Sequence, residues 1–300
     1  MATLYTRAES NIHKTWLLIT GFLVFIIFLG WIFSYLLDNS IFLVLAVILA
    51  IFQSILSYWY SDKIVLAMTR AKPIEKKDNP ELYRIIENLC LTAGLPLPKI
   101  YIIEEAQPNA FAAGRDAKHA VVAVTRGLLE KLEKSELEGV ISHELSHIGN
   151  KDMLLQTIVV VLVGIVAILS NFFLRISFFG GGRRRDSRDS GGAILAIFGI
   201  LAAILAPIAA TLVQLAISRK REFLADATGA LLTRYPEGLA KALEKISSDP
   251  NSLRVANNST AHLFIASPFR GEQAKNWITK LFSTHPPVEE RIKALREMSV

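Results

Sequence analysis

Charged residues and cysteine are both scarce in this sequence. Asp, Glu, Lys and Arg make up 20% of the 300 residues, whereas hydrophobic residues make up 52%. A soluble globular domain usually carries more charge, so the composition argues against an ordinary soluble protein. The only cysteine, Cys90, excludes an intramolecular disulfide framework and is typical of a reducing compartment. The composition therefore indicates a membrane protein.

Four hydrophobic runs account for the low charge, because none of them contains a charged residue. Each run has about 20 residues, which is enough to cross a hydrocarbon core roughly 30 Å thick. Buried core helices of a soluble protein rarely stay apolar over so many turns. The absence of charge inside the runs also argues against a transporter, which needs ionisable residues within the membrane. We therefore predict a multi-spanning membrane protein with spans at residues 15–37, 41–60, 153–174 and 193–217.

The first run lacks the features of a signal peptide, and the turn after it lacks basic residues. The run is longer than a signal-peptide apolar region, and residues 37–39 offer no small-residue cleavage pattern, so we expect it to remain as an anchor. Arg7 and Lys14 precede this run, and five further basic residues follow the second run between positions 63 and 77. By the positive-inside rule, the N-terminus and the segment after residue 61 are predicted on the cytoplasmic side of the plasma (inner) membrane.

The net charge of +6 lies largely at these membrane borders. The lipid bilayer is therefore the expected partner of the basic residues, and nucleic acid is not. The low-complexity loop at residues 180–192 (GGGRRRDSRDSGG) is an exception, because an even number of crossings would place its arginines outside the cytoplasm. Two explanations stay open: stronger topology signals override this loop, or the second hydrophobic hairpin dips into the membrane without spanning it.

The polar stretch between the two hydrophobic pairs has the patterns of a folded domain. Apolar residues recur at helical spacing over residues 80–92, and Gly94 predicts the end of that helix. Residues 99–103 and 120–125 are rich in β-branched residues and predict strands, and residues 109–114 are a third candidate.

Ser135 and Glu138 form a capping-box pattern, which predicts a helix that runs to Gly149. This helix carries the sequence SHELSH at residues 142–147, directly before the third hydrophobic run. The part of the chain from residue 218 onward is also predicted to be mostly helical.

The two histidines of this sequence stand at metal-ligand spacing. Residues four apart share one face of a helix, so His143 and His147 can both reach a single metal ion. That face lies opposite the apolar stripe of the helix, which should face the core. Glu144 follows the first histidine, where its carboxylate can deprotonate a metal-bound water without being a ligand. The alternative is a pair of surface histidines on an amphipathic helix.

A catalytic zinc site with three protein ligands requires one more residue. Glu222 is the candidate, because it follows the fourth hydrophobic run closely and can ligate a metal. Asp226 lies one helical turn later, where it can accept a hydrogen bond from the far nitrogen of a ligand histidine. The small residues Ala225 and Gly229 would permit close helix packing here. The alternative is an ordinary solvent-facing carboxylate pair next to the basic residues 219–221.

Three segments together resemble one family of membrane proteases: HELSHIGNKD at residues 143–152, SRKREFLAD at residues 218–226 and THPP at residues 284–287. They are similar to the HtpX group of membrane zinc proteases, which belong with the CAAX-processing prenyl-protein endopeptidases and related gluzincins. The resemblance covers essentially the whole chain. It implies one Zn²⁺ per chain, ligated by His143, His147 and Glu222, with Glu144 as catalytic base. It also implies ATP-independent endoproteolysis of damaged or misfolded membrane proteins in envelope stress control.

The resemblance also assigns roles to two further segments. Asn109, Ala110 and Phe111 resemble the edge strand on which gluzincins bind a substrate as an added strand, and the alternative is a plain surface loop. His285 would lie over the zinc, either donating a hydrogen bond to the developing oxyanion or acting as a fourth ligand at rest. The alternative for His285 is a position at the start of a helix, whose first turn suits the prolines that follow. His262 is left without a role.

These patterns together predict a predominantly α-helical, multi-spanning membrane protein with a gluzincin-like zinc protease domain that contains a small β-sheet. Residues 1–61 would form a first transmembrane hairpin and residues 153–217 a second. Residues 62–152 and 218–300 would form the cytoplasmic protease domain, acting on membrane-protein or unfolded-protein substrates. A membrane scaffold or transporter with an incidental metal site is the competing prediction. An intramembrane protease would need the motif within an apolar helix, and nearby charged residues argue against that.

Overall fold

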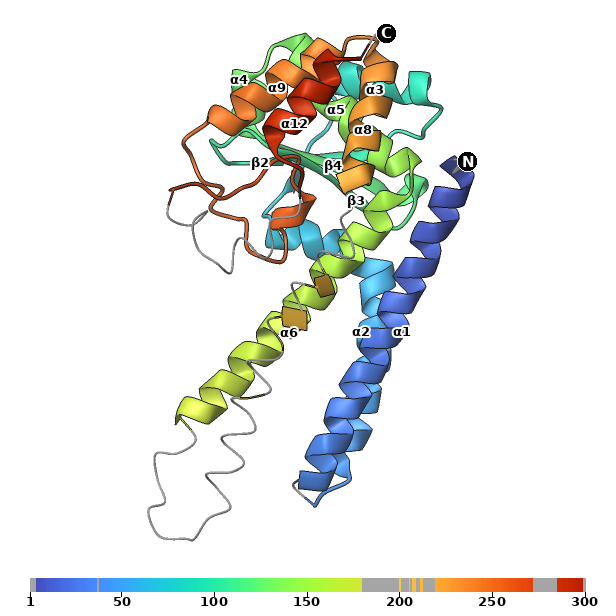
Figure 1. Ribbon diagram of the computed structural model, residues 1–300, viewed down its shortest axis with the longest axis vertical. Coiled ribbons are helices and arrows are strands. Elements are labelled where there is room, and N and C mark those ends of the chain that lie inside the picture. The colour runs from blue at the N-terminus through green and yellow to red at the C-terminus, as the bar shows by residue number, and fades with distance from the viewer. Residues whose placement is uncertain are drawn as a thin grey trace.

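The computed structural model describes residues 4–36, 38–179, 219–271 and 285–298, together with positions 200, 205, 207, 208, 211 and 212. A head of helices and a small sheet carries long helices that extend from it (Figure 1). α1 (Leu4–Leu36) and α2 (Ile41–Met68) form a hairpin, and α6 (Asp152–Phe179) leaves the head separately. The loop at residues 180–192 and most of the fourth hydrophobic run lie outside the described residues.

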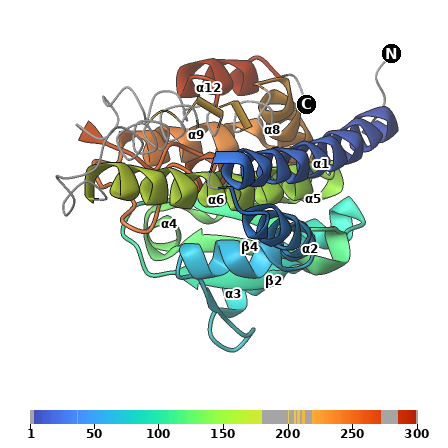
Figure 2. The same ribbon diagram turned by 90° about the horizontal axis from the view of Figure 1, so that it is seen from below.

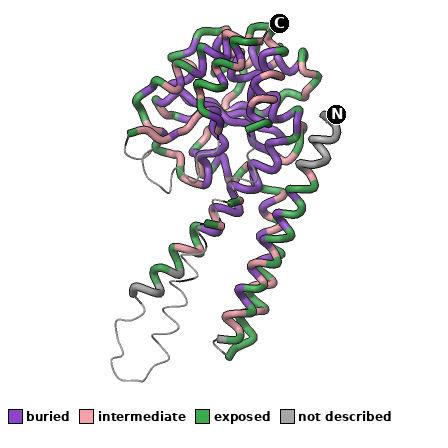
Figure 3. The backbone as a smooth tube through the Cα atoms, in the orientation of Figure 1, coloured by how far each residue is buried: buried purple, intermediate pink, exposed green. Residues whose placement is uncertain are grey.

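Three of the described helices are long and apolar enough to cross a membrane, over Ile12–Tyr35, Ile41–Met68 and Asp152–Phe172. They coincide with the first three predicted spans. Along α1 and α2, exposed residues dominate away from the head (Figure 3), and they include large apolar side chains such as Phe28 and Ile48. Apolar surface of this extent fits a lipid environment. The prediction of a multi-spanning, predominantly helical membrane protein is confirmed.

Aromatic residues gather at both ends of the α1–α2 hairpin. Trp16 stacks on Tyr58 at the end near the head, with ring centroids 5.6 Å apart. Trp31 stacks on Tyr35 toward the far end, at 6.3 Å. Because Trp and Tyr are enriched at membrane–water interfaces, these pairs indicate the two boundaries of the bilayer. The head therefore begins at one of these boundaries.

The head contains a four-stranded sheet in the order β1-β2-β4-β3. β2 (Lys99–Ile103) and β4 (Ala120–Thr125) pair in parallel, while β1 (Lys72–Pro73) and β3 (Ala110–Gly114) pair antiparallel at the two edges. The three predicted strands are confirmed, whereas the two residues of β1 are too few to give a pattern. All five residues of the alanine-rich β3 are buried, so burial rather than strand propensity accounts for this strand.

The sheet lies directly over the head ends of the membrane helices. One face packs on the helices of the head through side chains such as Ile102. On the other face, Phe111 shares a cluster with Val65 of α2 and Val160 of α6. This packing places β3 next to the membrane boundary.

α3 (Pro80–Ala93) has nearly the boundaries that its sequence predicts. Asn79 accepts a hydrogen bond from the backbone N–H of Leu82 at 3.0 Å, and Pro80 occupies the first helical position. Gly94 ends the helix in the left-handed conformation, with φ +65°. Three other short elements complete this part of the head and its C-terminal loop: α4 (Arg126–Lys131), η1 (Ala117–His119) and η2 (Ala261–Leu263).

α5 (Lys134–Gly149) runs through the middle of the head. α8 (Arg219–Thr233), α9 (Pro236–Ser248) and α12 (Val288–Arg296) gather on the side of α5 away from the sheet (Figure 2). Nearly every side chain of α5 is therefore buried. α8 covers the histidine face, which lies opposite the apolar stripe, so both of these faces of α5 are buried.

The capping box predicted for α5, Ser135 with Glu138, is wrong by two residues. The helix is capped by Glu133, whose backbone N–H donates to the carboxylate of Glu136 at 2.8 Å, instead of by Ser135. Lys245 of α9 contacts the same Glu136 carboxylate at 2.7 Å. Packing against α9 thus favours the capping box of Glu133 and Glu136 over the one predicted two residues later.

Candidate metal centre

Three potential metal ligands meet where α5 faces α8. His143 and His147 come from α5 and Glu222 from α8, and one ligand atom of each lies within 4.8 Å of the others. The two Nε2 atoms are 3.2 Å apart, and His147 Nε2 lies 3.7 Å from Glu222 Oε1. A tetrahedral zinc ion with bonds of about 2.0–2.1 Å would hold two nitrogens about 3.3 Å apart. The structure thus brings the three predicted ligands together at close to the spacing of a tetrahedral site.

The close approach of α8 to α5 depends on small residues. At Gly229, an added Cβ would lie 2.9 Å from the backbone nitrogen of His143, which is closer than real side chains come. Ala225, one turn earlier, is fully buried. A larger residue at position 229 would push α8 away and move Glu222 out of reach. The close packing expected from Ala225 and Gly229 is therefore present.

Carboxylates orient both histidines through their far nitrogens. His143 Nδ1 lies 2.9 Å from Asp226 Oδ1, and His147 Nδ1 lies 3.4 Å from Asp152 Oδ2. When each Nδ1–H donates to its carboxylate, both Nε2 atoms face the cluster with lone pairs, as metal ligands do. Asp226 holds its ring as the sequence suggested. Asp152, the first residue of α6, was not singled out, although it lies in the segment HELSHIGNKD.

The donor set and the burial of the cluster fit a divalent metal ion. The side chains of the three ligands are at most 6% exposed. Buried charges persist where they are paired or coordinate a metal. Two imidazole nitrogens and one carboxylate oxygen are a ligand set that zinc accepts. The residues present therefore fit the metal that the family resemblance implies.

Burial and neighbouring charges set the protonation of the three ligands. Burial lowers the pKa of His143 despite the nearby Asp226 carboxylate. Burial would also lower the pKa of His147. The carboxylates of Asp152 and Glu222 outweigh this effect and raise the pKa of His147 to about 9. Burial would raise the pKa of Glu222, yet His285 and His147 hold that pKa well below its usual value. A metal ion must therefore displace a proton from His147.

Glu144 lies on α5 between the two histidines. Glu144 is 1% exposed, and this burial raises the pKa of its carboxyl group to about 7. His147 and the backbone N–H of Ala112 in β3 oppose this shift in the pKa. Within the described residues, the Oε1 atom has no hydrogen-bond partner. The structure thus places a carboxyl that can exchange a proton near neutral pH between the metal cluster and the edge strand.

The structure narrows how residues 109–111 can contact a substrate. The Asn109 side chain donates to the carbonyl of Ala266 at 3.0 Å, and Phe111 is fully buried. The Ala110 carbonyl already accepts a hydrogen bond from the N–H of Ile265 at 3.0 Å. Ala110 and Phe111 belong to the edge strand β3, and Asn109 directly precedes it. Any substrate contact along this edge would be made by backbone groups beyond Ala110, so the assignment of Asn109 and Phe111 to substrate binding stays a prediction.

His285 lies beside the cluster and contacts one of its ligands. Its Nδ1 is 2.9 Å from Glu222 Oε2, and its buried Nε2 has no hydrogen-bond partner in the described part of the chain. α12 begins at Val288, so His285 precedes the helix by a few residues. Thr284, which belongs to the quoted motif, lies outside the described residues. His285 is therefore close enough to act at the metal centre without being one of the three clustered ligands.

Arg291 of α12 is a buried part of the site that the sequence analysis missed. Its Nε and Nη2 donate to the two oxygens of Asp226 at 2.8 and 2.7 Å, and its Nη1 donates to the carbonyl of Ile265 at 2.8 Å. Burial disfavours the charge, but the Asp226 carboxylate outweighs it and raises the pKa of Arg291. The sequence carries a signal for the burial of Arg291, because Arg291 follows Val288 by three residues and so lies on the apolar face of the helix.

His262, His119 and His13 are not among the three clustered ligands. His262 is 1% exposed, and its Nε2 donates to the carbonyl of Gln156 at 3.2 Å. Burial lowers the pKa of His262 to about 4, so its ring is neutral. His119 is half exposed and pairs with Asp116. His13 is exposed on α1.

The fold and the site together define a class of protein. Membrane helices carry a head in which an H-E-x-x-H helix and a glutamate from a second helix form a buried three-ligand cluster. This is the arrangement of a membrane-bound metalloprotease of the gluzincin type.

Comparison with known proteins identifies the family. The model of Peptidase family M48 matches residues 76–299. A protein named protease HtpX homolog from Thermoanaerobacter pseudethanolicus is 45% identical over 301 residues, covering 99% of each chain. Another of that name from Pyrococcus furiosus is 48% identical over 269 residues, covering 89% of this chain and 90% of its own. The chain belongs to peptidase family M48 and is a metalloprotease, which confirms the resemblance.

Among solved structures, Ste24p of S. mikatae is similar at 19% identity with a TM-score of 0.46. The match covers 97% of this chain and 67% of that chain.

Proposed function

We propose that this protein is a zinc-dependent endopeptidase of the plasma membrane that cleaves damaged or misfolded membrane proteins at the cytoplasmic face. The observation that carries the proposal is the buried cluster of His143, His147 and Glu222, with Glu144 between it and the edge strand β3. Peptide hydrolysis needs an activated water, a base and a strand edge to which a substrate can add. The similarity to proteins named protease HtpX homolog supports proteolysis as the activity.

Each polar group of the site has a step to perform. A zinc ion on the three ligands would supply Lewis acidity, which lowers the pKa of a bound water and polarises the scissile carbonyl. Glu144 would accept a proton from the attacking water at Oε1, the oxygen without a hydrogen bond, and deliver it to the leaving amine. Its pKa of about 7 is matched to both transfers. Asp226 and Asp152 would keep the histidine rings oriented.

His285 would stabilise the oxyanion that develops on the substrate carbonyl. Its Nδ1 contacts the Glu222 carboxylate, so Nε2 can donate a hydrogen bond only when the ring carries both protons. This role differs from that of a fourth metal ligand at rest, which would require a neutral ring with its lone pair on the metal.

The location of the site supports a membrane substrate. β3 packs over the head ends of α2 and α6, and Arg115 directly after β3 lies 4.5 Å from the ring centroid of Trp59 in α2. A substrate bound at β3 would therefore be cut close to the membrane boundary. The positive-inside pattern of the first hairpin supports a cytoplasmic position for the head.

Metal removal tests the proposed function. The purified protein is expected to contain about one zinc per chain and to cleave an unfolded polypeptide. A chelator should abolish cleavage, and added zinc should restore it. Since protons compete with the metal for His147, whose pKa is raised to about 9, chelation should become easier as the pH falls. Cleavage that persists after complete zinc removal would contradict the zinc dependence, whereas a zinc-loaded protein with no cleavage activity would favour a membrane scaffold.

His285→Ala distinguishes the two roles of that histidine. Loss of an oxyanion donor is expected to lower turnover by about 10²–10³-fold at unchanged zinc content. Removal of a resting fourth ligand should instead leave turnover intact or raise it. The measurement is kcat for an unfolded polypeptide, together with zinc content. His119→Ala, which removes a half-exposed histidine, is the matched control and should match the wild type.

A further inference from the structure

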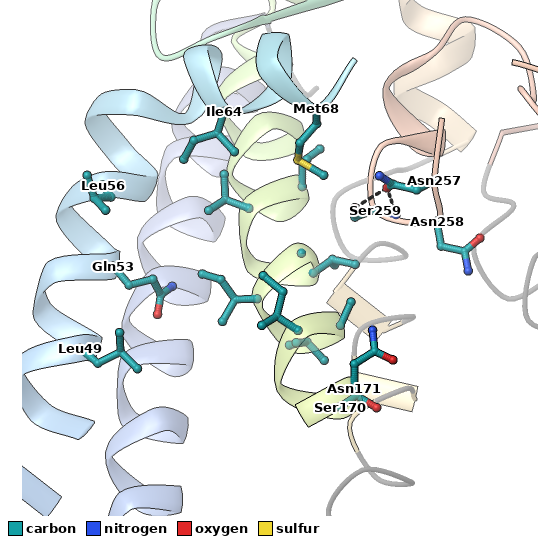
Figure 4. Close-up of a pocket in the computed structure, with 18 of the residues that line it drawn as sticks. Leu49, Gln53, Leu56, Ile64, Met68, Ser170, Asn171, Asn257, Asn258 and Ser259 are labelled. Atoms are coloured by element: carbon teal, nitrogen blue, oxygen red, sulfur yellow. Dashed lines mark hydrogen bonds between the residues drawn. The ribbon is translucent and has the colours of Figure 1, made fainter. Parts of the chain in front are cut away.

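A cavity opens between α2 and α6 within the membrane-spanning part of the molecule (Figure 4). It has a volume of about 930 Å³ and is lined mainly by apolar side chains. Leu49, Phe52 and Leu56 contribute from α2, and Gly164 and Ile168 contribute from α6. These helices belong to the candidate spans, so the cavity faces the interior of the bilayer.

The chain's own fourth hydrophobic run makes its described contacts elsewhere. Leu205 is buried in a cluster with Leu18 of α1 and Leu155 of α6, and Leu212 packs against the same cluster. None of these four residues lines the cavity. Leu205 and Leu212 therefore pack in a cluster formed by α1, α2 and α6, whereas the cavity lies between α2 and α6.

The volume of the cavity suits a short length of helix. An α-helix with its side chains is about 10–12 Å across and rises about 1.5 Å per residue. On these dimensions, 930 Å³ corresponds to roughly two turns of helix. A transmembrane helix seated between α2 and α6 would keep its remaining surface in lipid.

Polar groups in the cavity favour a protein occupant over a lipid chain. Gln53 reaches from α2 toward α6 (Figure 4), is 7% exposed, and makes no hydrogen bond within the described residues. Asn171 and the loop residues Asn257 and Asn258 also line the cavity. A buried amide in hydrocarbon is costly unless it is hydrogen-bonded, and polar side chains on a neighbouring helix can supply that bond. An acyl chain cannot.

The wall of the cavity packs against the edge strand of the metal centre. Val160 of α6 lines the cavity and also packs in the cluster that contains Phe111 of β3. The loop at residues 257–259 borders the cavity, and a few residues later the Ile265 N–H donates to the carbonyl of Ala110 in β3. A chain that leaves the cavity toward the head therefore meets β3 and then Glu144.

We infer that this cavity docks a transmembrane helix of the protein substrate, so that the segment leaving the membrane is presented to β3. The inference rests on the proposed endopeptidase function and names the substrate class, namely proteins with an apolar membrane-spanning helix. Docking of the helix raises the effective concentration of the adjoining segment at the site. It acts on substrate binding and not on the chemical step.

Two glycines allow the inference to be tested with the same substitution. An added Cβ meets no heavy atom within 4 Å at Gly164, which lines the cavity, or at Gly21, which is exposed on α1 away from it. Gly164→Phe would place a ring in the cavity, whereas Gly21→Phe would place one against lipid. The full-length variants in nanodiscs of one lipid composition would receive two substrates. One is an unfolded polypeptide fused to an apolar transmembrane helix, and the other is the same polypeptide without the helix.

The expected result is a selective loss. Gly164→Phe should raise KM for the anchored substrate at least about tenfold, because the tethering contact is lost. It should cleave the free polypeptide at the wild-type rate, and Gly21→Phe should match the wild type on both. Unchanged cleavage of the anchored substrate by Gly164→Phe would overturn the inference, and so would equal slowing on both substrates.

A photoreactive amino acid at position 52 tests docking without catalysis. An adduct with the anchored substrate supports the inference, whereas adducts only with lipid or with a second copy of the chain overturn it. Failure of the proposed function is distinguishable, because the wild type would then cleave neither substrate while the crosslinking result still stands.

Discussion

Glu144→Gln is expected to remove proteolytic activity while leaving the metal in place. Glu144 is not among the three clustered ligands, so metal binding should survive its neutralisation. The amide cannot take a proton from the attacking water, and loss of a positioned base typically costs about 10²–10⁴-fold in rate. The carboxyl and the amide have nearly the same shape, so the packing around position 144 should be preserved. The measurements are kcat for an unfolded polypeptide and zinc per chain.

Glu138→Gln is the matched control for this substitution. Glu138 lies on the same helix, nearer its N-terminus, and pairs only with Lys134 at 4.0 Å among the described residues. The control variant should retain wild-type turnover and zinc. If Glu144→Gln kept more than about a tenth of wild-type turnover, the general-base role would be contradicted. If it lost zinc as well, Glu144 would have to be counted among the ligands.

Arg291→Met is expected to destabilise the fold and loosen the metal together. Arg291 is 1% exposed and donates two hydrogen bonds to Asp226, so the substitution leaves a buried carboxylate without its partner. Breaking a buried ion pair from one side typically costs about 3–5 kcal/mol. Because Asp226 orients His143, metal affinity should also fall, by roughly 10–100-fold for the loss of an outer partner. Thermal unfolding and competition with a zinc chelator measure the two effects.

Arg296→Met on the same helix is the control for Arg291. Its side chain is 45% exposed and pairs with Glu237 and Glu244, and exposed pairs contribute about 0–1 kcal/mol. A double variant, Arg291→Met with Asp226→Asn, should recover part of the stability because no charge remains buried alone. It should not recover metal affinity, since His143 has lost its anionic partner. Equal melting temperatures for Arg291→Met and Arg296→Met would contradict the buried ion pair.

Much of the site was predictable because its central residues are close together in the sequence. His143, Glu144 and His147 lie within one helical turn or so, and the spacing alone puts both rings on one face. Glu222 is distant in sequence, but the need for a third ligand and the adjacent small residues pointed to it. The strand at residues 109–114 was harder, since its alanines have little strand propensity, and its burial against the membrane helices becomes visible only in the fold.

What the sequence could not supply are the partners contributed by other elements. Arg291 is buried because α8 and α12 meet there, and an arginine beside two glutamates normally indicates a solvated helix face. Asp152 reaches His147 only because α6 starts directly after α5. Tertiary cover likewise buried the histidine face of α5, which periodicity alone assigns to solvent. In each case a contact between separate helices decided the outcome.

The metal centre is divided between two parts of the chain that are made at different times. His143 and His147 precede the second hydrophobic hairpin (residues 153–217), whereas Glu222, His285 and Arg291 follow it. A ribosome adds roughly 5–20 residues per second, so Glu222 is added about 4–15 s after the two histidines, and His285 and Arg291 about 7–30 s after them. During that interval the nascent chain has its base and two ligands but cannot close the site. The enzyme is thus expected to stay catalytically silent until Glu222 has been translated and α8 has packed against α5.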